Sequence, residues 1–144
     1  LAMRFAASHQ DRSTGQSLVE FTIALPVFLL VMLAIAEGGY FVAATTAVSH
    51  ATHEGARLGV LDSTGASSAI RSRVKDSASV LVTVTDSDIS LELNGTACND
   101  ACYSGRNSGD RLGVTTAYTH RPLISFVFDS VGFQANATTE LFVE

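Results

Sequence analysis

The residues that could carry out catalysis form two short patterns, and neither is complete. His53 and Glu54 begin an H-E-x-x-H zinc motif, but Arg57 occupies the second histidine position, so the i, i+4 pair of metal ligands is missing. Ser72 and Lys75 fit S-x-x-K, yet the S-D-N and K-T-G elements that accompany this nucleophile are absent from the sequence. No glycine pattern indicates a P-loop or a dinucleotide site. We therefore expect no enzyme activity and no cofactor.

The two cysteines of the chain, Cys98 and Cys102, lie in a segment rich in Gly, Asn, Asp and Ser that we expect to be a loop between two strands. In an exported domain an even pair indicates a disulfide. Free thiols and a metal site are the alternatives. Zinc would need two further ligands, and the nearest histidines along the chain, His50, His53 and His120, belong to other predicted elements.

A single carboxylate, Glu20, stands at the start of a strongly apolar run. Sixteen residues from Phe21 to Ala36 carry no formal charge, and ten of them are Phe, Ile, Leu or Val. On an insertion scale of roughly −0.3 to −0.6 kcal/mol each, these ten contribute about −3 to −6 kcal/mol. A helix from residue 18 to 44 would be roughly 40 Å long, at about 1.5 Å per residue. The segment can span a membrane.

Basic residues set the orientation of this span. Arg4 and Arg12 precede it, and the next basic residue is Arg57, so the N-terminus is expected in the cytoplasm and the rest of the chain outside. A secretory signal peptide cleaved after Ala36 or beyond is the rival interpretation. The run exceeds the 7–15 residues of a signal core, and Glu37 followed by two glycines is a poor cleavage region.

Periodicity predicts an α+β domain beyond the span. Ala44, Val48, Ala51, Gly55 and Leu58 form a narrow apolar stripe on a continuing helix, which Gly59 is expected to end. Residues 66–78 predict a short amphipathic helix with Ala66, Ile70, Val74 and Ala78 on its apolar face. Strands are predicted at 80–85, 89–94, 111–118 and 133–143, with an apolar loop or short helix after Pro122. The result is a long helix covered in its outer half by an antiparallel sheet of about four strands.

The stretch GQSLVEF, from Gly15 to Phe21, resembles the class III prepilin signal. The apolar run that follows it, then HEGARLG and YTHRPL, resembles TadE-like minor pseudopilins of the tight-adherence (Tad, or Flp) type IVb pilus. The resemblance implies a pilin-like fold and cleavage by a prepilin peptidase between Gly15 and Gln16, with Glu20 and Phe21 as the recognised pair. The resemblance also includes Pro26, Glu37 and the EGAR element, residues 54–57, which correspond to features of the family. Unlike typical type IV pilins, the mature chain would begin with Gln16 rather than phenylalanine.

The domain organisation implied is a cytoplasmic leader at 1–15, a transmembrane helix at 16–44 and an extracytoplasmic pseudopilin domain at 45–144. The partners implied are membrane lipid, the peptidase, other Tad pilins and pseudopilins, and the assembly platform. The full sequence has 9 basic and 14 acidic residues, and removal of the leader takes away Arg4, Arg12 and Asp11. The remaining chain has a formal charge of −6, which makes nucleic acid an unfavourable partner. The alternative functions are an uncleaved membrane-anchored binding domain and, more remotely, an exported enzyme.

Three of these features have alternative roles. Pro26 is either a tolerated membrane-helix proline or a hinge that leaves the Thr22 carbonyl without its helical donor. Glu37 either marks the end of the span or pairs with a neighbouring subunit. The EGAR element is expected to pack helix against sheet rather than bind a ligand, because Gly55 permits close approach and Arg57 can reach an acidic neighbour.

Overall fold

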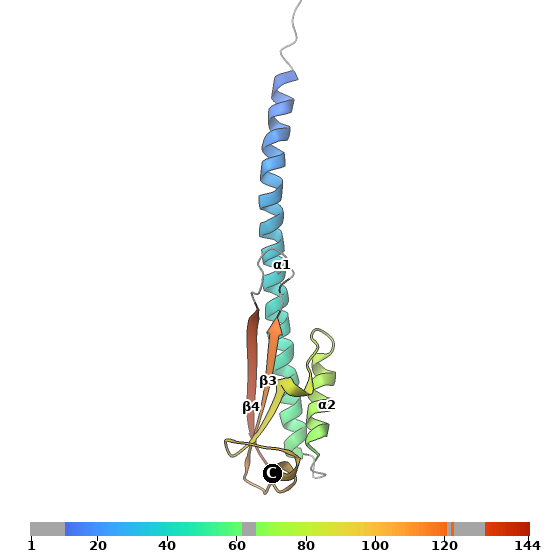
Figure 1. Ribbon diagram of the computed structural model, residues 1–144, viewed down its shortest axis with the longest axis vertical. Coiled ribbons are helices and arrows are strands. Elements are labelled where there is room, and N and C mark those ends of the chain that lie inside the picture. Colours follow the sequence, from blue (N-terminus) through green and yellow to red (C-terminus); the bar gives the residue numbers. More distant parts are fainter. Residues whose placement is uncertain (1–10, 62–65, 121, 123–131) are drawn as a thin grey trace, which may run out of the picture. The chain divides into compact units, whose positions relative to one another are not determined.

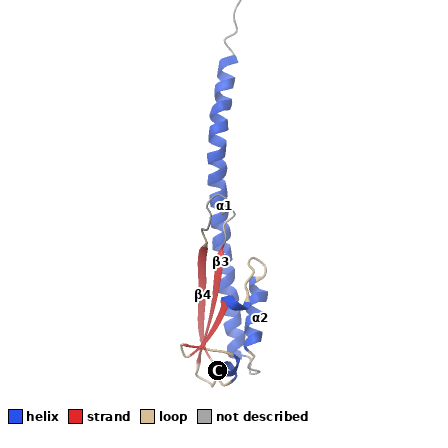
Figure 2. Cartoon of the chain, in the orientation of Figure 1, coloured by secondary structure: helices blue, strands red, loops and turns tan. Residues whose placement is uncertain are grey.

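The structure is a computed structural model that describes residues 11–61, 66–120, 122 and 132–144. It divides into two compact units, Leu1–Gly38 and Gly39–Glu144. The elements, drawn in Figure 1 and coloured by type in Figure 2, are α1 (Asp11–Leu61), α2 (Ser67–Ala78), the 3₁₀ turn η1 (Asp86–Asp88), β1 (Ile89–Leu93), β2 (Thr96–Ala97), α3 (Asp100–Ser104), β3 (Arg111–His120) and β4 (Phe133–Phe142). The predicted α+β class, with a long apolar helix, a short helix and a four-stranded antiparallel sheet in a pilin-like layout, is confirmed.

In the first unit, α1 exposes almost all of its apolar side chains. Leu18 is 70% exposed and Ile35 is 65% exposed, and the large apolar residues between them range from 38% at Leu25 to 69% at Ile23, apart from the half-buried Leu33. A helix that is apolar all round needs an apolar surrounding. By length and composition, the stretch of α1 that starts at Gly15 could cross a membrane.

In the second unit, α1 packs through the predicted stripe of small residues. Ala44, Val48 and Ala51 are fully buried or nearly so, Gly55 is buried, and Leu58 is half-buried. The stripe is therefore confirmed as the packed face of the helix. Small side chains let neighbouring elements approach the helix axis closely, which is why both α2 and β3 contact this face.

The predicted end of α1 at Gly59 is wrong, because the helix continues to Leu61. A Cβ atom at Gly59 would lie 2.6 Å from Leu112 Cδ2 and 2.8 Å from Ile70 Cδ1. Glycine is thus required here by close packing against β3 and α2, and its backbone is helical. Local sequence signals do not separate this requirement from a helix end.

The second helix, α2, forms where its period predicted it. Ile70, Val74 and Ala78 are buried on one face, and Ser67 is buried with them. Ala66 does not belong to that face, since it is the exposed residue that precedes the first turn. The apolar face packs on α1, where Val74 Cγ2 occupies the space beside Gly55.

The sheet has the strand order β2-β1-β3-β4, with every neighbouring pair antiparallel. Its register places Leu91 opposite Val114, and Thr116 opposite Ala137. Alternate residues of β3 are buried towards α1, as period two requires. Three of the predicted strands, at β1, β3 and β4, are confirmed.

The prediction of a strand at 80–85 is wrong. Val82 and Val84 are buried, as alternation predicted, but the segment joins no ladder in the described sheet. Its first residues form a turn in which the backbone N–H groups of Leu81 and Val82 donate to Ala78 O. The fourth strand is instead β2, and the predicted loop after it contains α3. Most of the apolar segment after Pro122 lies outside the described residues.

The core of the second unit lies between α1, α2 and the sheet. Its buried apolar residues are Ala44, Val48, Ala51, Ala56, Ile70, Val74, Ala78, Val82, Val84, Ile89, Leu91, Cys98, Tyr103, Leu112, Val114 and Val143.

Candidate processing and assembly site

The predicted processing residues follow one another along an exposed stretch of α1. Gln16 Nε2 donates to Glu20 Oε1 over 3.3 Å, one helical turn away. Phe21 is 63% exposed. A Cβ atom at Gly15 would have no heavy atom within 4 Å, so packing in the described structure does not require glycine at this position. Because glycine is about 1 kcal/mol less favourable than alanine inside a helix, α1 opens more easily here than at a typical residue.

Pro26 lies inside α1 without ending it. Proline has no N–H, so the carbonyl of Thr22 lacks its usual i+4 donor. The Thr22 side chain bonds to the preceding turn, with Oγ1 donating to Leu18 O over 2.7 Å. This helical turn is therefore held by fewer backbone hydrogen bonds than its neighbours.

Glu37 contrasts with the apolar residues before it, because it is only 9% exposed. It is the last carboxylate of the first unit and stands two residues before the boundary between the units. The next acidic residue, Glu54, comes more than four turns later. Glu37 is therefore the one acidic residue of α1 between Glu20 and Glu54.

The EGAR element packs α1 against α2, whereas we expected it to pack against the sheet. A Cβ atom at Gly55 would collide with Val74 Cγ2 of α2. Glu54 forms an ion pair that the sequence did not indicate, since Arg73 Nη2 of α2 lies 3.1 Å from Glu54 Oε2. The hydrogen bond from Arg73 is the largest cause and lowers the pKa of Glu54. Burial raises this pKa by less, and the charges of Arg73 and Arg57 each lower it by a smaller amount. Arg57 itself is exposed.

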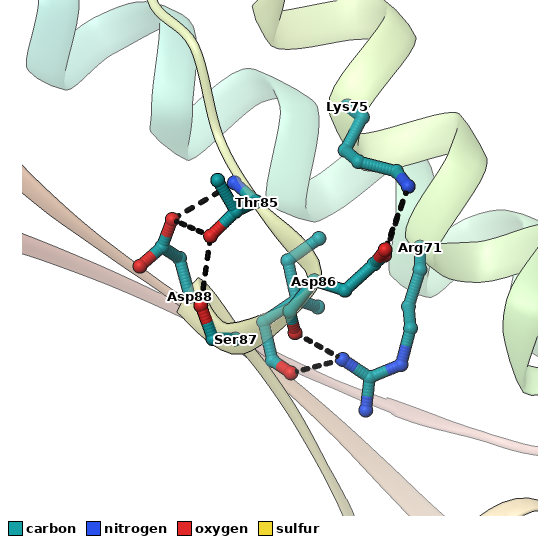
Figure 3. Close-up of polar contacts among 7 residues, drawn as sticks. Arg71, Lys75, Thr85, Asp86, Ser87 and Asp88 are labelled. Atoms are coloured by element: carbon teal, nitrogen blue, oxygen red, sulfur yellow. Dashed lines mark hydrogen bonds and ion pairs between the residues drawn. The ribbon is translucent and has the colours of Figure 1, made fainter.

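A polar cluster that the sequence did not indicate ties α2 to the start of the sheet (Figure 3). Arg71 donates through Nη1 to the backbone oxygens of Asp86, at 2.6 Å, and Ile89, at 2.5 Å. Lys75 Nζ lies 2.9 Å from Asp86 Oδ1. The cluster fixes η1, and the lysine of the S-x-x-K pattern is engaged in this structural ion pair. In the sequence, this cluster was indicated only by the basic residues on the polar face of the predicted helix.

Residues Thr85 to Asp88 close the same cluster with a capping box. The backbone N–H of Thr85 donates to Asp88 Oδ2 over 2.8 Å, and the Thr85 hydroxyl lies 2.6 Å from the same oxygen. Paired side chains of this kind satisfy the free backbone donors of a short helical turn. They explain why the chain bends at η1 before it enters β1.

The cysteines lie at disulfide-bonding distance, with 2.05 Å between the sulfurs of Cys98 and Cys102. The loop that they close contains the start of α3, where the Asn99 side chain accepts a hydrogen bond from the N–H of Cys102. Tyr103, the next residue, is fully buried and donates through its hydroxyl to Gly59 O over 2.6 Å. The bridge thus restrains the segment that docks on the end of α1.

The histidines do not converge. His50 and His53 line an open groove between α1 and β4, together with small or polar residues of both elements. His120 is buried on β3, with its ring 5.4 Å from Tyr40 and 5.6 Å from Phe41. Within the described part of the chain, no group of three or more His, Cys, Asp or Glu side chains could hold a metal ion.

These features define a pilin-like α+β protein whose N-terminal helix could cross a membrane. Residues 15–57 match the family described as TadE-like protein, which confirms the resemblance over this helix. No curated protein and no solved structure matches the chain.

Proposed function

We propose that this chain is a minor pseudopilin that a prepilin peptidase cleaves after Gly15 and that takes part in assembling a Tad/Flp adhesion pilus. It acts by packing and carries out no chemistry of its own. Its N-terminus faces the cytoplasm, and its second unit lies outside the cytoplasmic membrane. Its partners are membrane lipid, the peptidase, other Tad pilins and pseudopilins, and the assembly platform, with no nucleic acid among them.

The observation that carries the proposal is where the family match begins. It starts at Gly15, the residue before the proposed scissile bond, and extends through the whole apolar helix to Arg57. The matched segment contains Glu20 five residues after that glycine. An acidic residue opposes membrane insertion, so its position calls for a function.

Glu20 has such a function if cleavage creates a new N-terminus at Gln16. The α-ammonium must then lie among apolar helices, where an unpaired charge is costly. The hydrogen bond from Gln16 to Glu20 brings the two residues to neighbouring positions on the helix surface. The carboxylate can pair with the ammonium of its own chain or with that of an adjacent subunit, which would fix the axial register between helices.

Pro26 and Glu37 complete the proposed assembly surface of the first unit. The weakened turn at Pro26 allows the helix to bend as it moves from the bilayer into a packed bundle. Glu37 offers a second acidic group, about four to five turns beyond Glu20, for pairing between subunits. In this proposal both residues act on neighbouring helices.

Processing is tested by the mass and N-terminal sequence of the protein recovered from its native host. Wild type should begin at Gln16. Gly15→Arg should stay uncleaved because it places bulk and charge at the scissile bond, while Gly15→Ala, the matched control, should be cleaved. A full-length wild-type protein would contradict the proposal and leave the uncleaved membrane-anchored domain.

Assembly is tested by the amount of this subunit in sheared pili or cross-linked complexes relative to the membrane pool. Glu20→Ala should insert normally and be recruited poorly, and Glu20→Asp should be recruited in part because its reach is one methylene shorter. Glu20→Gln keeps the shape and removes the charge, so it should behave as Glu20→Ala does. Recruitment of Glu20→Gln at the wild-type level would reject charge pairing.

A further inference from the structure

The exposed apolar side chains of the second unit gather at one of its ends. Seven large apolar residues are exposed in the described part of 39–144, and all but Leu61 and Phe142 belong to this group. We name the other five the apolar collar: Tyr40, Val42, Val80, Leu81 and Phe133. Val80 is the most exposed, at 86%.

Direct contacts join the three segments that form the apolar collar. Tyr40 Oη donates to Leu81 O over 2.8 Å, which ties α1 to the turn after α2. The ring of Phe41 lies 5.8 Å from that of Phe133, which ties α1 to the start of β4. Figure 1 shows the end of β3, the start of β4 and the turn after α2 at the same end of this unit.

The geometry of α1 distributes the apolar collar around the helix. Successive residues of an α-helix point about 100° apart. Tyr40 therefore faces the turn after α2, Phe41 faces β4, and Val42, which is 63% exposed, faces a third direction. The apolar surface surrounds the helix where it enters the second unit.

Charged residues are absent from the sequence of these segments. Residues 39–49, 77–85 and 132–139 contain no Asp, Glu, Lys or Arg. The described charged side chains of the second unit lie further along α1, on α2 as far as Asp76 in its last turn, at η1, and on the sheet and its loops, where Asp110, Arg111 and Glu140 are near the end away from the apolar collar. A surface without charge can enter an apolar medium at little electrostatic cost.

We propose that the apolar collar inserts into the lipid interface of the membrane that α1 spans, so that the base of the second unit sits in the bilayer surface. Lipid fits this surface because the apolar collar begins in the same helix, four residues after the apolar run ends at Ala36, with Glu37 as the one charged residue between them. Tyrosine with an apolar body and a polar tip is typical of membrane interfaces. The inference rests on the membrane-anchoring part of the proposed function and does not depend on the pilus.

The test uses tryptophan fluorescence, because the chain contains no tryptophan. Full-length Val80→Trp, Phe133→Trp and Phe142→Trp are reconstituted separately into liposomes whose lipids carry bromine near the carbonyl end of the acyl chain. Phe142 is the matched control, since it is an exposed phenylalanine on the same strand as Phe133 and about 30 Å away, at roughly 3.3 Å per residue. Val80 is so exposed that the substitution displaces no packed neighbour.

Val80→Trp and Phe133→Trp should lose fluorescence in brominated liposomes and emit at shorter wavelength, while Phe142→Trp should be unaffected. Equal quenching at all three positions, at none, or at only one of Val80 and Phe133 would overturn the proposal. Absence of quenching would show that the apolar collar stays out of the lipid. Because the liposomes contain no peptidase and no other pilin, such a result would leave cleavage after Gly15 untouched.

Discussion

Thr52 of α1 and Thr116 of β3 meet through their hydroxyl groups, 2.8 Å apart, with neither side chain exposed to solvent. The Thr52 hydroxyl also lies 2.7 Å from Val48 O, one turn earlier in the same helix. Thr52 therefore has a second partner, and its contact with Thr116 is a buried polar link between the helix and the sheet.

Because Thr52 has a second hydrogen-bond partner, substitutions of Thr52 and Thr116 by valine should lower the free energy of unfolding by different amounts. Thr116→Val should lower the free energy of unfolding only slightly, because Thr52 still donates to Val48 O. Thr52→Val should cost about 1–3 kcal/mol, because it leaves the buried Thr116 hydroxyl without this partner. Chemical denaturation of the full chain in detergent measures both, and the double valine variant should recover most of the loss. Equal costs for the two single variants would refute the asymmetry.

Gly55→Ala should destabilise the second unit by about 1–3 kcal/mol, because the new Cβ atom meets the rigid Val74 side chain and forces α1 and α2 apart. Val74→Ala in the same chain should recover part of that loss. Gly39→Ala is the control, since its Cβ atom would meet nothing within 4 Å and should add about 0.5–1 kcal/mol to helix stability. Thermal unfolding followed by circular dichroism would compare the variants. Identical behaviour of Gly55→Ala and Gly39→Ala would argue against close helix packing.

The Glu54–Arg73 pair predicts a pH dependence with a definite sign. The folded-state pKa of Glu54 lies below its usual value of 4.5, chiefly because of the hydrogen bond from Arg73. The pair's contribution to stability is therefore fully present above about pH 4.5 and is lost as the pH falls through the lowered pKa. Arg73→Gln should raise the pKa of Glu54 towards its usual value, and Arg57→Gln should raise it less. Carboxyl chemical shifts followed by NMR titration measure both, and a larger rise with Arg57→Gln would contradict the assigned partner.

The cysteine pair predicts that exported protein denatured without reductant contains no thiol that can be alkylated. Cys98→Ser should lower the free energy of unfolding by about 2 kcal/mol for so short a closed loop. Hydrogen exchange should accelerate mainly between Thr96 and Asp110, including the N–H of Tyr103. Cys102→Ser, at the less buried of the two positions, should produce the same regional change. Two reactive thiols in native exported protein would show that the bridge does not form there.

Local periodicity in the sequence was enough to predict most of the elements. The 3.6-residue period of Ile70, Val74 and Ala78 predicted α2, and strict alternation predicted β1, β3 and β4. These predictions were correct because each element buries one face, and the apolar residues of that face recur at a fixed spacing along the sequence. The processing residues from Gly15 to Phe21 were identified differently, by the resemblance of this stretch to the class III prepilin signal. Their roles stay predictions until cleavage and recruitment are measured.

Tertiary structure alone decided which partner each residue meets. Val82 and Val84 alternate as strand residues do and are buried as expected, yet the segment has no ladder, because a strand also needs a neighbouring backbone that local sequence does not specify. Gly59 looked like a helix end because the sequence does not reveal that Leu112, more than fifty residues later, occupies the space beside it. The sequence did not indicate that Glu54 pairs with Arg73, for the same reason: the two residues lie on different helices. Pairing and close packing join distant residues, so they follow from how the chain folds back on α1, whereas the elements themselves follow from which residues stand next to one another.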